Sequence, residues 1–111
     1  MDFEYCKIEI FLPEQFLPEL RETLTRAGAG HIGKYDCCLS WAKVHSSWRP
    51  LPGAKPYSGK EMAVSVEEEI KAEVTARRDD VDEIVREIRK IHPYEEPVIN
   101  VIPLWKTGID Y

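Results

Sequence analysis

The chain lacks the features of membrane-spanning, secreted and disulfide-stapled proteins. No run approaches the roughly 20 apolar residues of a membrane span, and residues 1–4 lack the basic start of a signal peptide. The three cysteines are an odd number, and the adjacent Cys37 and Cys38 do not form a disulfide framework. We therefore expect a cytoplasmic protein with reduced thiols. No metal or cofactor is needed for folding, because 111 residues can bury a core of their own.

Positive charge and catalytic motifs are also scarce. Fifteen Lys and Arg residues against twenty Asp and Glu residues give a net charge of -5, which argues against a general nucleic-acid or anionic-membrane binder. The chain has no nucleophile elbow, no zinc-protease helix motif, no C-x-x-C pair and no Walker loop. Nothing in the sequence demands an enzyme, and we expect a non-catalytic protein.

The apolar pattern predicts one domain over residues 1–111, built from four strands and two helices. Two-residue alternation or continuous apolar character predicts strands over residues 3–12, 36–42, 69–77 and 98–104. Helical spacing predicts helices over residues 16–27 and 79–91. The order β-α-β-β-α-β predicts a ferredoxin-like α+β fold. Its four-stranded antiparallel sheet has the order 4-1-3-2, with both helices on one face.

The two-residue period also assigns the side chains of these strands to faces. It places Cys37, Leu39 and Trp41 toward the core, and Glu69 on the wet face of the third strand. The sheet face without helices would carry outward aromatic residues of the first strand and an apolar fourth strand. Such a face suggests a covering subunit, so we expect a homo-oligomer.

A glycine-rich segment over residues 28–33 formally satisfies the G-x-G-x-x-G dinucleotide fingerprint. It follows a helix and precedes a strand, whereas a pyrophosphate site needs the helix N-terminus after the glycines. The segment is therefore interpreted as a helix stop and turn.

Residues 43–65 are rich in Pro, Gly and Ser and are predicted to form a long loop. Four cations without an acidic residue between them, and three aromatic or imidazole rings, lie along residues 43–60: Lys43, His45, Trp48, Arg49, Lys55, Tyr57 and Lys60. A cation for charge and a ring for stacking could capture an anion such as a nucleotide phosphate. The alternative is a solvated loop or a subunit contact. Loops of this length are uncommon unless they are functional or disordered.

Between the last helix and the last strand, two prolines bracket groups that serve in metal ligation and acid-base chemistry: His92, Tyr94, Glu95 and Glu96. Adjacent residues of an extended chain point in opposite directions, so Glu95 and Glu96 do not readily share one site. A metal would need further ligands, with His31, His45 and Cys38 as candidates across an interface. The alternative is a rigid connector whose polar groups bond to backbone or to a neighbouring subunit.

Three of these segments together, residues 28–38, 49–59 and 92–97, resemble the CutA/PII-like domain inserted in bacterial Nif-three (Ngg-one-interacting-factor-three) proteins. The resemblance spans nearly the whole chain and implies a free-standing homologue of that insert, similar in fold to the CutA and PII proteins. Members with this insert are dinuclear-metal hexamers. Their metal ligands lie in flanking segments that this chain does not contain, so the metal-centre activity is not implied here.

The leading hypothesis is a non-catalytic, oligomeric regulatory module that binds a small anionic ligand or a partner protein, with a trimer as the favoured state. The second hypothesis is a CutA-like divalent cation binder that uses His92, Glu95, Glu96 or His31. The third hypothesis, a small hydrolase or isomerase, has only the presence of His, Tyr and Glu in its favour.

Overall fold

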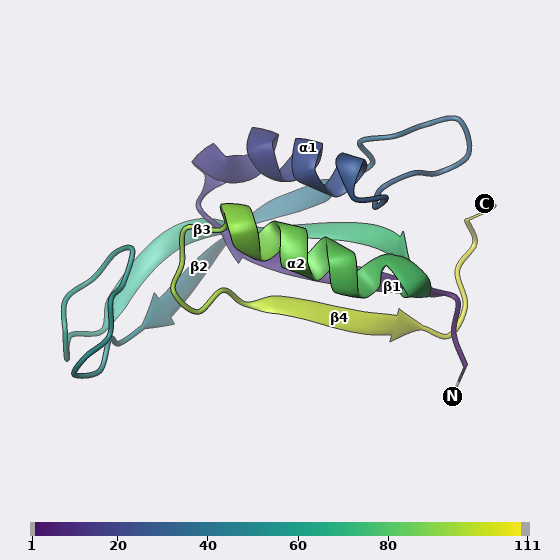
Figure 1. Cartoon of the computed structure of the whole chain (residues 1–111). Helices are drawn as coiled ribbons and strands as arrows, with labels where there is room; N and C mark the ends of the chain where they lie inside the picture. Colours follow the sequence, from purple (N-terminus) through teal and green to yellow (C-terminus); the bar gives the residue numbers. More distant parts are fainter. Residues whose placement is uncertain (1, 110–111) are drawn as a thin grey trace.

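The computed structural model describes residues 2–109, which fold into four strands, two α-helices and two short 3-10 helices. In order, the elements are β1 (Tyr5–Leu12), η1 (Glu14–Phe16), α1 (Leu17–Arg26), β2 (Ser40–Trp48), β3 (Ser65–Arg77), η2 (Arg78–Asp80), α2 (Val81–Ile91) and β4 (Ile99–Leu104). The strands form one antiparallel sheet in the order β2-β3-β1-β4, and both helices cover one face of it (Figure 1). The predicted ferredoxin-like α+β fold, including the order 4-1-3-2, is confirmed.

The core lies between the sheet and the two helices. In β1 every second residue is buried, because successive side chains of a strand point to opposite faces. The helices add fully buried residues at helical spacing: Leu20, Leu24, Ile84 and Ile88. Pro18 stands in the first turn of α1, where the absence of its N–H is tolerated.

The second strand begins later than predicted. β2 starts at Ser40 instead of residue 36. Before that point Gly30 holds the chain: its N–H donates to the carbonyl of Thr75, and its carbonyl accepts from the N–H of Cys38, both at 3.0 Å. If β2 began earlier, it would need the carbonyl of Thr75 in β3 as a hydrogen-bond acceptor, but Gly30 already occupies that acceptor.

The side chains around the start of β2 also differ from the prediction. Leu39 packs against the core, but Cys37 is exposed and has a φ of 55°. Trp41 pairs with the fully buried Ala72 and so lies on the helix-covered face of the sheet, as predicted, but it is 44% exposed. Over this position α1 presents a cation instead of an apolar residue, because the guanidinium carbon of Arg21 lies 5.5 Å from the centre of the Trp41 ring.

β2 and β3 form a hairpin that extends beyond β1, whose last partner in β3 is Ile70. β2 continues to Trp48, so Lys43, His45 and Trp48 are strand residues and not loop residues as predicted. The loop itself covers residues 49–64 and lies at the opposite end of the molecule from the α1–β2 connection (Figure 1).

The sheet face without helices carries a cluster of four charges from β1 and β3. The Nζ of Lys71 lies 3.4 Å from carboxylate oxygens of Glu9 and Glu73, and the Nζ of Lys7 lies 3.7 Å and 3.5 Å from the same two groups. Burial raises the pKa of Glu9, but the hydrogen bond and charge of Lys71 outweigh it and lower the pKa. This face is therefore charge-balanced at its centre.

Candidate functional site

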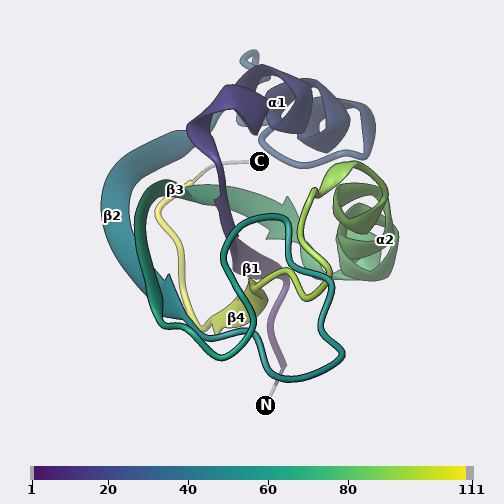
Figure 2. The ribbon, with the colours of Figure 1, turned by 90° about the vertical axis from the view of Figure 1, so that its left-hand side faces the viewer.

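The loop at residues 49–64 folds back over the end of the sheet (Figure 2). The indole N–H of Trp48 donates to the carbonyl of Ser58 (3.0 Å), and the hydroxyl of Ser58 donates to Oε2 of Glu67 (2.6 Å). The backbone N–H of Lys55 donates to Oε1 of Glu95 (3.0 Å). These bonds join the loop to β3 and to the segment after α2, so two motifs that lie far apart in the sequence meet.

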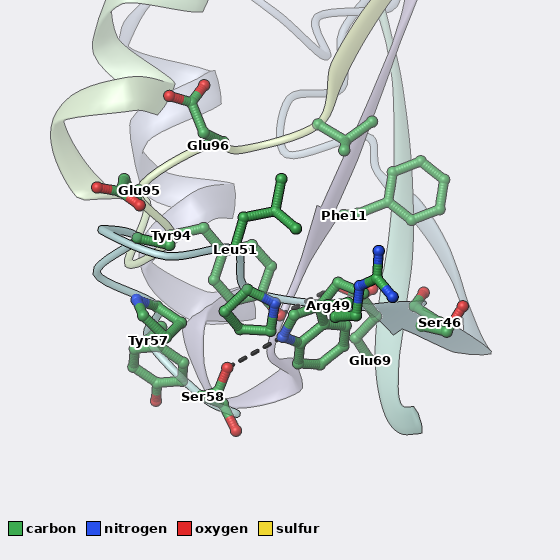
Figure 3. Close-up of a pocket in the computed structure, with 16 residues that line it drawn as sticks. Phe11, Ser46, Arg49, Leu51, Tyr57, Ser58, Glu69, Tyr94, Glu95 and Glu96 are labelled. Atoms are coloured by element: carbon green, nitrogen blue, oxygen red, sulfur yellow. Dashed lines mark hydrogen bonds between the residues drawn. The ribbon is translucent and has the colours of Figure 1, made fainter. Parts of the chain in front are cut away.

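A pocket with a volume of about 530 Å³ lies between the loop, the β2–β3 hairpin and the segment after α2 (Figure 3). Its lining residues are Phe11, Ser46, Ser47, Trp48, Arg49, Pro50, Leu51, Ala54, Pro56, Tyr57, Ser58, Glu69, Tyr94, Glu95, Glu96 and Val98. Nine of these sixteen side chains are aromatic or aliphatic, and seven are polar or charged. This size and composition are typical of small-molecule sites.

Glu69 of β3 is a buried carboxylate in this pocket. It was predicted on the wet face of its strand, but it is only 7% exposed because the loop and the segment after α2 cover it. The hydroxyl of Tyr94 donates to Oε1 of Glu69 (3.1 Å). Burial, followed by the negative charge of Glu69, raises the pKa of the Tyr94 phenol. The phenol therefore stays protonated and acts as a hydrogen-bond donor.

His92 lies behind the pocket and supports it. Its Nε2 donates to the carbonyl of Phe11 (2.6 Å), and its Nδ1 accepts from the N–H of Tyr94 (3.2 Å). Burial lowers the pKa of His92, which favours the neutral ring that this pattern requires. Both ring nitrogens are engaged, so in this conformation His92 positions Tyr94 and offers no nitrogen to a metal ion.

The predicted ligand-binding residues divide into two groups. Those that line the pocket are Trp48, Arg49, Tyr57, Tyr94, Glu95 and Glu96. Those that do not line it are Lys43, His45, Lys55, Lys60 and His92. The Nζ of Lys43 lies 3.6 Å from carboxylates of Glu14 and Glu68, and the Nε2 of His45 lies 3.9 Å from Glu68. Of the four predicted cations, Arg49 is the one that lines the pocket.

The candidate metal ligands do not come together. Within residues 2–109, no group of three or more His, Cys, Asp or Glu side chains could hold a metal ion. His31 lies after α1, far from the pocket, and its Nε2 donates to the carbonyl of Thr25 (2.9 Å). Cys38 directs its Sγ to the carbonyl of Asp36 (3.6 Å). The predicted metal ligands therefore do not meet in one cluster within the described part of the chain.

Sequence reasoning missed the role of Glu69. The available signal is the run of three glutamates, residues 67–69, at the entry to an otherwise alternating strand. Each of the three has its own partner: Glu67 binds Ser58, Glu68 pairs with Lys43, and Glu69 binds Tyr94. The alternation rule placed Glu69 on a wet face because it contains no information about a loop that folds back.

Comparison with known proteins places this geometry in a family. Residues 57–111 match the family model described as CutA1 divalent ion tolerance protein. A curated relative from Halalkalibacterium halodurans, named GTP cyclohydrolase 1 type 2 homolog, is 37% identical over 102 residues, which cover 92% of this chain and 27% of the relative. A Bacillus cereus protein related to NIF3 superposes with a TM-score of 0.80 and 28% identity, over 94% of this chain and 26% of that chain.

This chain is a CutA-like homologue of the NIF3-related proteins. It spans about a quarter of the length of the curated relatives that it matches. The predicted resemblance is confirmed.

The fold of this CutA-like chain is also that of shorter proteins. CutA from Archaeoglobus fulgidus superposes with a TM-score of 0.67 and 18% identity, over 93% of this chain and 86% of that chain. GlnK from Bacillus subtilis superposes with a TM-score of 0.64 and 18% identity, over 92% of this chain and 86% of that chain. At these identities the likeness concerns the fold, and it confirms the CutA/PII-like arrangement.

Neither helix described within residues 2–109 combines the length and the apolar character that crossing a membrane requires.

Proposed function

We propose that this CutA-like chain is a non-catalytic binding module that folds as a single domain over residues 1–111 and holds a small ligand in the pocket under loop 49–64. The observation that carries the proposal is the pocket itself. Its volume is about 530 Å³, the Lys55–Glu95 hydrogen bond joins the two distinctive motifs of the chain beside it, and the Trp48–Ser58 hydrogen bond fixes the loop to the end of β2. The activity named for the curated relatives stays outside the proposal, because the chain covers only about a quarter of their length.

The charge at the pocket supports an anionic ligand. Arg49 lines the pocket and has no ion-pair or hydrogen-bond partner among residues 2–109, whereas the exposed Lys43 is already paired with two carboxylates. A guanidinium can bind a carboxylate or a phosphate through two parallel hydrogen bonds. We infer that Arg49 provides the anion contact that the sequence predicted for the loop as a whole.

The test is a binding screen with nucleoside monophosphates and aromatic carboxylates, followed by isothermal titration calorimetry. Arg49→Glu is expected to weaken the binding of any hit at least tenfold. Lys60→Glu is the matched control, because it makes the same charge change on the same loop at a residue outside the pocket lining. Its expected effect is less than twofold. Equal losses in the two variants would show that only the net charge of the loop matters, and the pocket assignment would be wrong.

We infer that the module is a homo-oligomer, with a trimer favoured, assembled through the sheet face without helices. That face is open in a single chain, and Ile102 of β4 pairs there with Lys7 of β1 while remaining 37% exposed. Trp105, just beyond β4, is 80% exposed. Native mass spectrometry of the protein purified without chelator checks the state: a trimer supports the proposal, and a monomer at micromolar concentration contradicts it.

The second candidate function is divalent cation binding, favoured by the description of the matched CutA1 family. Glu95 and Glu96 lie at the pocket and provide carboxylate ligands. Titration of copper and zinc into the protein and into a Glu95→Gln, Glu96→Gln double variant tests this function. A cation site at the pocket requires at least a tenfold loss of affinity in the variant. His92→Ala tests the predicted imidazole ligand in the same way, and unchanged affinity in both variants would remove the hypothesis.

A further inference from the structure

The carboxylate of Glu69 has an unused hydrogen-bond acceptor inside the pocket. Its Oε1 accepts from the hydroxyl of Tyr94, but within residues 2–109 its Oε2 has no hydrogen-bond or ion-pair partner. The side chain is 7% exposed and belongs to the pocket lining. A buried polar atom without a partner is uncommon in native proteins, because its lost hydration is not replaced. A ligand with a hydrogen-bond donor would supply the missing partner of Oε2.

Arg49 offers the opposite chemistry in the same pocket. It has hydrogen-bond donors and no acceptor, and it pairs with none of the residues 2–109, Glu69 included. The two groups therefore do not neutralise each other and remain available. A ligand that satisfies both must carry hydrogen-bond donors at one position and an anionic group at another.

The aromatic walls of the pocket favour a flat ring. The indole of Trp48 is fixed by its hydrogen bond to Ser58. The ring of Tyr57 is held between two others: its centre lies 6.2 Å from the ring centre of Phe16 and 5.8 Å from that of Tyr94. Figure 3 shows residues of the loop, of β2 and β3 and of the segment after α2 converging on the hollow that these rings border. Fixed aromatic side chains stack on flat ligands at small cost in conformational entropy.

We propose that the pocket binds a flat heteroaromatic ring whose N–H groups donate to the Glu69 carboxylate and whose anionic substituent pairs with Arg49. This inference rests on the proposed ligand-binding function and adds the chemical class of the ligand. In it, Glu69 selects the ring, because a carboxylate accepts from N–H groups and repels ring edges that present an acceptor. Tyr94 holds Glu69 in place through its hydroxyl, and His92 holds Tyr94.

Four nucleotides and nucleosides serve as probes in isothermal titration calorimetry. Guanosine monophosphate presents a ring N–H and an adjacent amino group, whereas inosine monophosphate lacks the amino group. Adenosine monophosphate presents a ring nitrogen acceptor at the matching position, and guanosine lacks the phosphate. We expect guanosine monophosphate to bind at least tenfold more tightly than the adenine nucleotide and than guanosine, with the inosine nucleotide between them.

Two variants assign the contacts. Glu69→Gln retains an acceptor for Tyr94 and is expected to remove the preference for guanosine monophosphate over adenosine monophosphate. Arg49→Met is expected to lower the affinity for guanosine monophosphate to that of guanosine and to leave guanosine binding unchanged. Glu61→Gln is the matched control, an exposed loop residue outside the pocket lining, with an expected effect below twofold. Thermal melting of each variant establishes that it is folded.

Adenosine monophosphate binding as tightly as guanosine monophosphate, or an unchanged preference in Glu69→Gln, would overturn the assignment of Glu69 and leave the pocket as a ligand site. Binding of none of the four probes would also overturn the ligand class. In that case the proposed function stands only if an aromatic carboxylate of the broader screen binds in an Arg49-dependent manner. If no compound of that screen binds either, the proposed function fails with it.

Discussion

Replacement of Tyr94 by phenylalanine removes one hydroxyl group and leaves the ring in place. In the native protein this hydroxyl donates to Glu69 over 3.1 Å, and the carboxylate that accepts is 7% exposed. A hydrogen bond to a charged group contributes about 1.5–3 kcal/mol to stability. Tyr94 is only half-buried, so water can partly replace the phenol. We therefore expect Tyr94→Phe to lower the free energy of unfolding by about 1–2 kcal/mol, around and below the lower end of that range.

Urea unfolding followed by circular dichroism measures this change at pH 7. The same loss corresponds to a melting temperature about 5–10 °C lower for a domain of this size. Tyr35→Phe is the matched control, because Tyr35 is 75% exposed and its hydroxyl has no hydrogen bond within residues 2–109. Its expected effect is below 0.5 kcal/mol, as for most surface substitutions away from specific contacts (~0.5 kcal/mol). Equal stability of Tyr94→Phe and the unsubstituted protein would show that the Glu69–Tyr94 bond is not a structural contact.

The pH dependence gives a second readout of the same bond. Burial and the charge of Glu69 raise the pKa of Tyr94 above its ordinary value of 10.0. Above pH 10 the phenol of the unfolded chain ionises while that of the folded protein stays protonated, and this favours unfolding. The contribution of the protonated phenol to stability is therefore complete below pH 10 and decreases as the pH rises further. The difference in stability between the unsubstituted protein and Tyr94→Phe should therefore shrink above pH 10. A difference that stays constant from pH 8 to pH 11 would contradict the raised pKa.

Three further predictions concern other parts of the chain. Gly30→Ala should destabilise the protein by about 2 kcal/mol or more, because the φ of Gly30 is +73° and the added Cβ would lie 2.8 Å from the backbone carbonyl oxygen of Cys38. Gly108→Ala is the control in the same urea titration and should be neutral, because no atom lies within 4 Å of the added Cβ. A maleimide should label the exposed Cys37 within minutes and leave Cys6 unlabelled, because Cys6 is fully buried and burial raises the pKa of its thiol. Mass spectrometry reads out the labelled residues, and labelling of both cysteines in the folded protein would refute this order. Burial lowers the pKa of His92, so its neutral ring stabilises the fold above pH 6.5 and this contribution is lost as the pH falls. The loss of stability between pH 7 and pH 5 should therefore be smaller in His92→Phe, and an equal slope would show that His92 does not titrate with unfolding.

Two segments of the candidate site are recognisable in the sequence from their composition. Residues 43–60 and 92–97 stand out because prolines, aromatic rings and charges gather there without a core pattern, and the structure brings parts of both segments around one pocket. Local composition is sufficient for that selection, since residues that neither pack into the core nor follow a regular period stand out in a short chain. It is not sufficient to say which members of each segment share a site: Lys55 and Lys60 belong to the loop but are not among the residues that line the pocket.

The sequence by itself determined the order of the elements and the core faces of β1 and β3, because periods of two and 3.6 residues identify strands and helices. It also determined the sheet topology, because the connections between the elements restrict how the strands pair. Only the tertiary structure decided that Gly30 takes the place of residues 36–39 beside β3, and that Glu69 is buried against Tyr94. Both outcomes depend on contacts between residues 25 or more positions apart, and no local period records them.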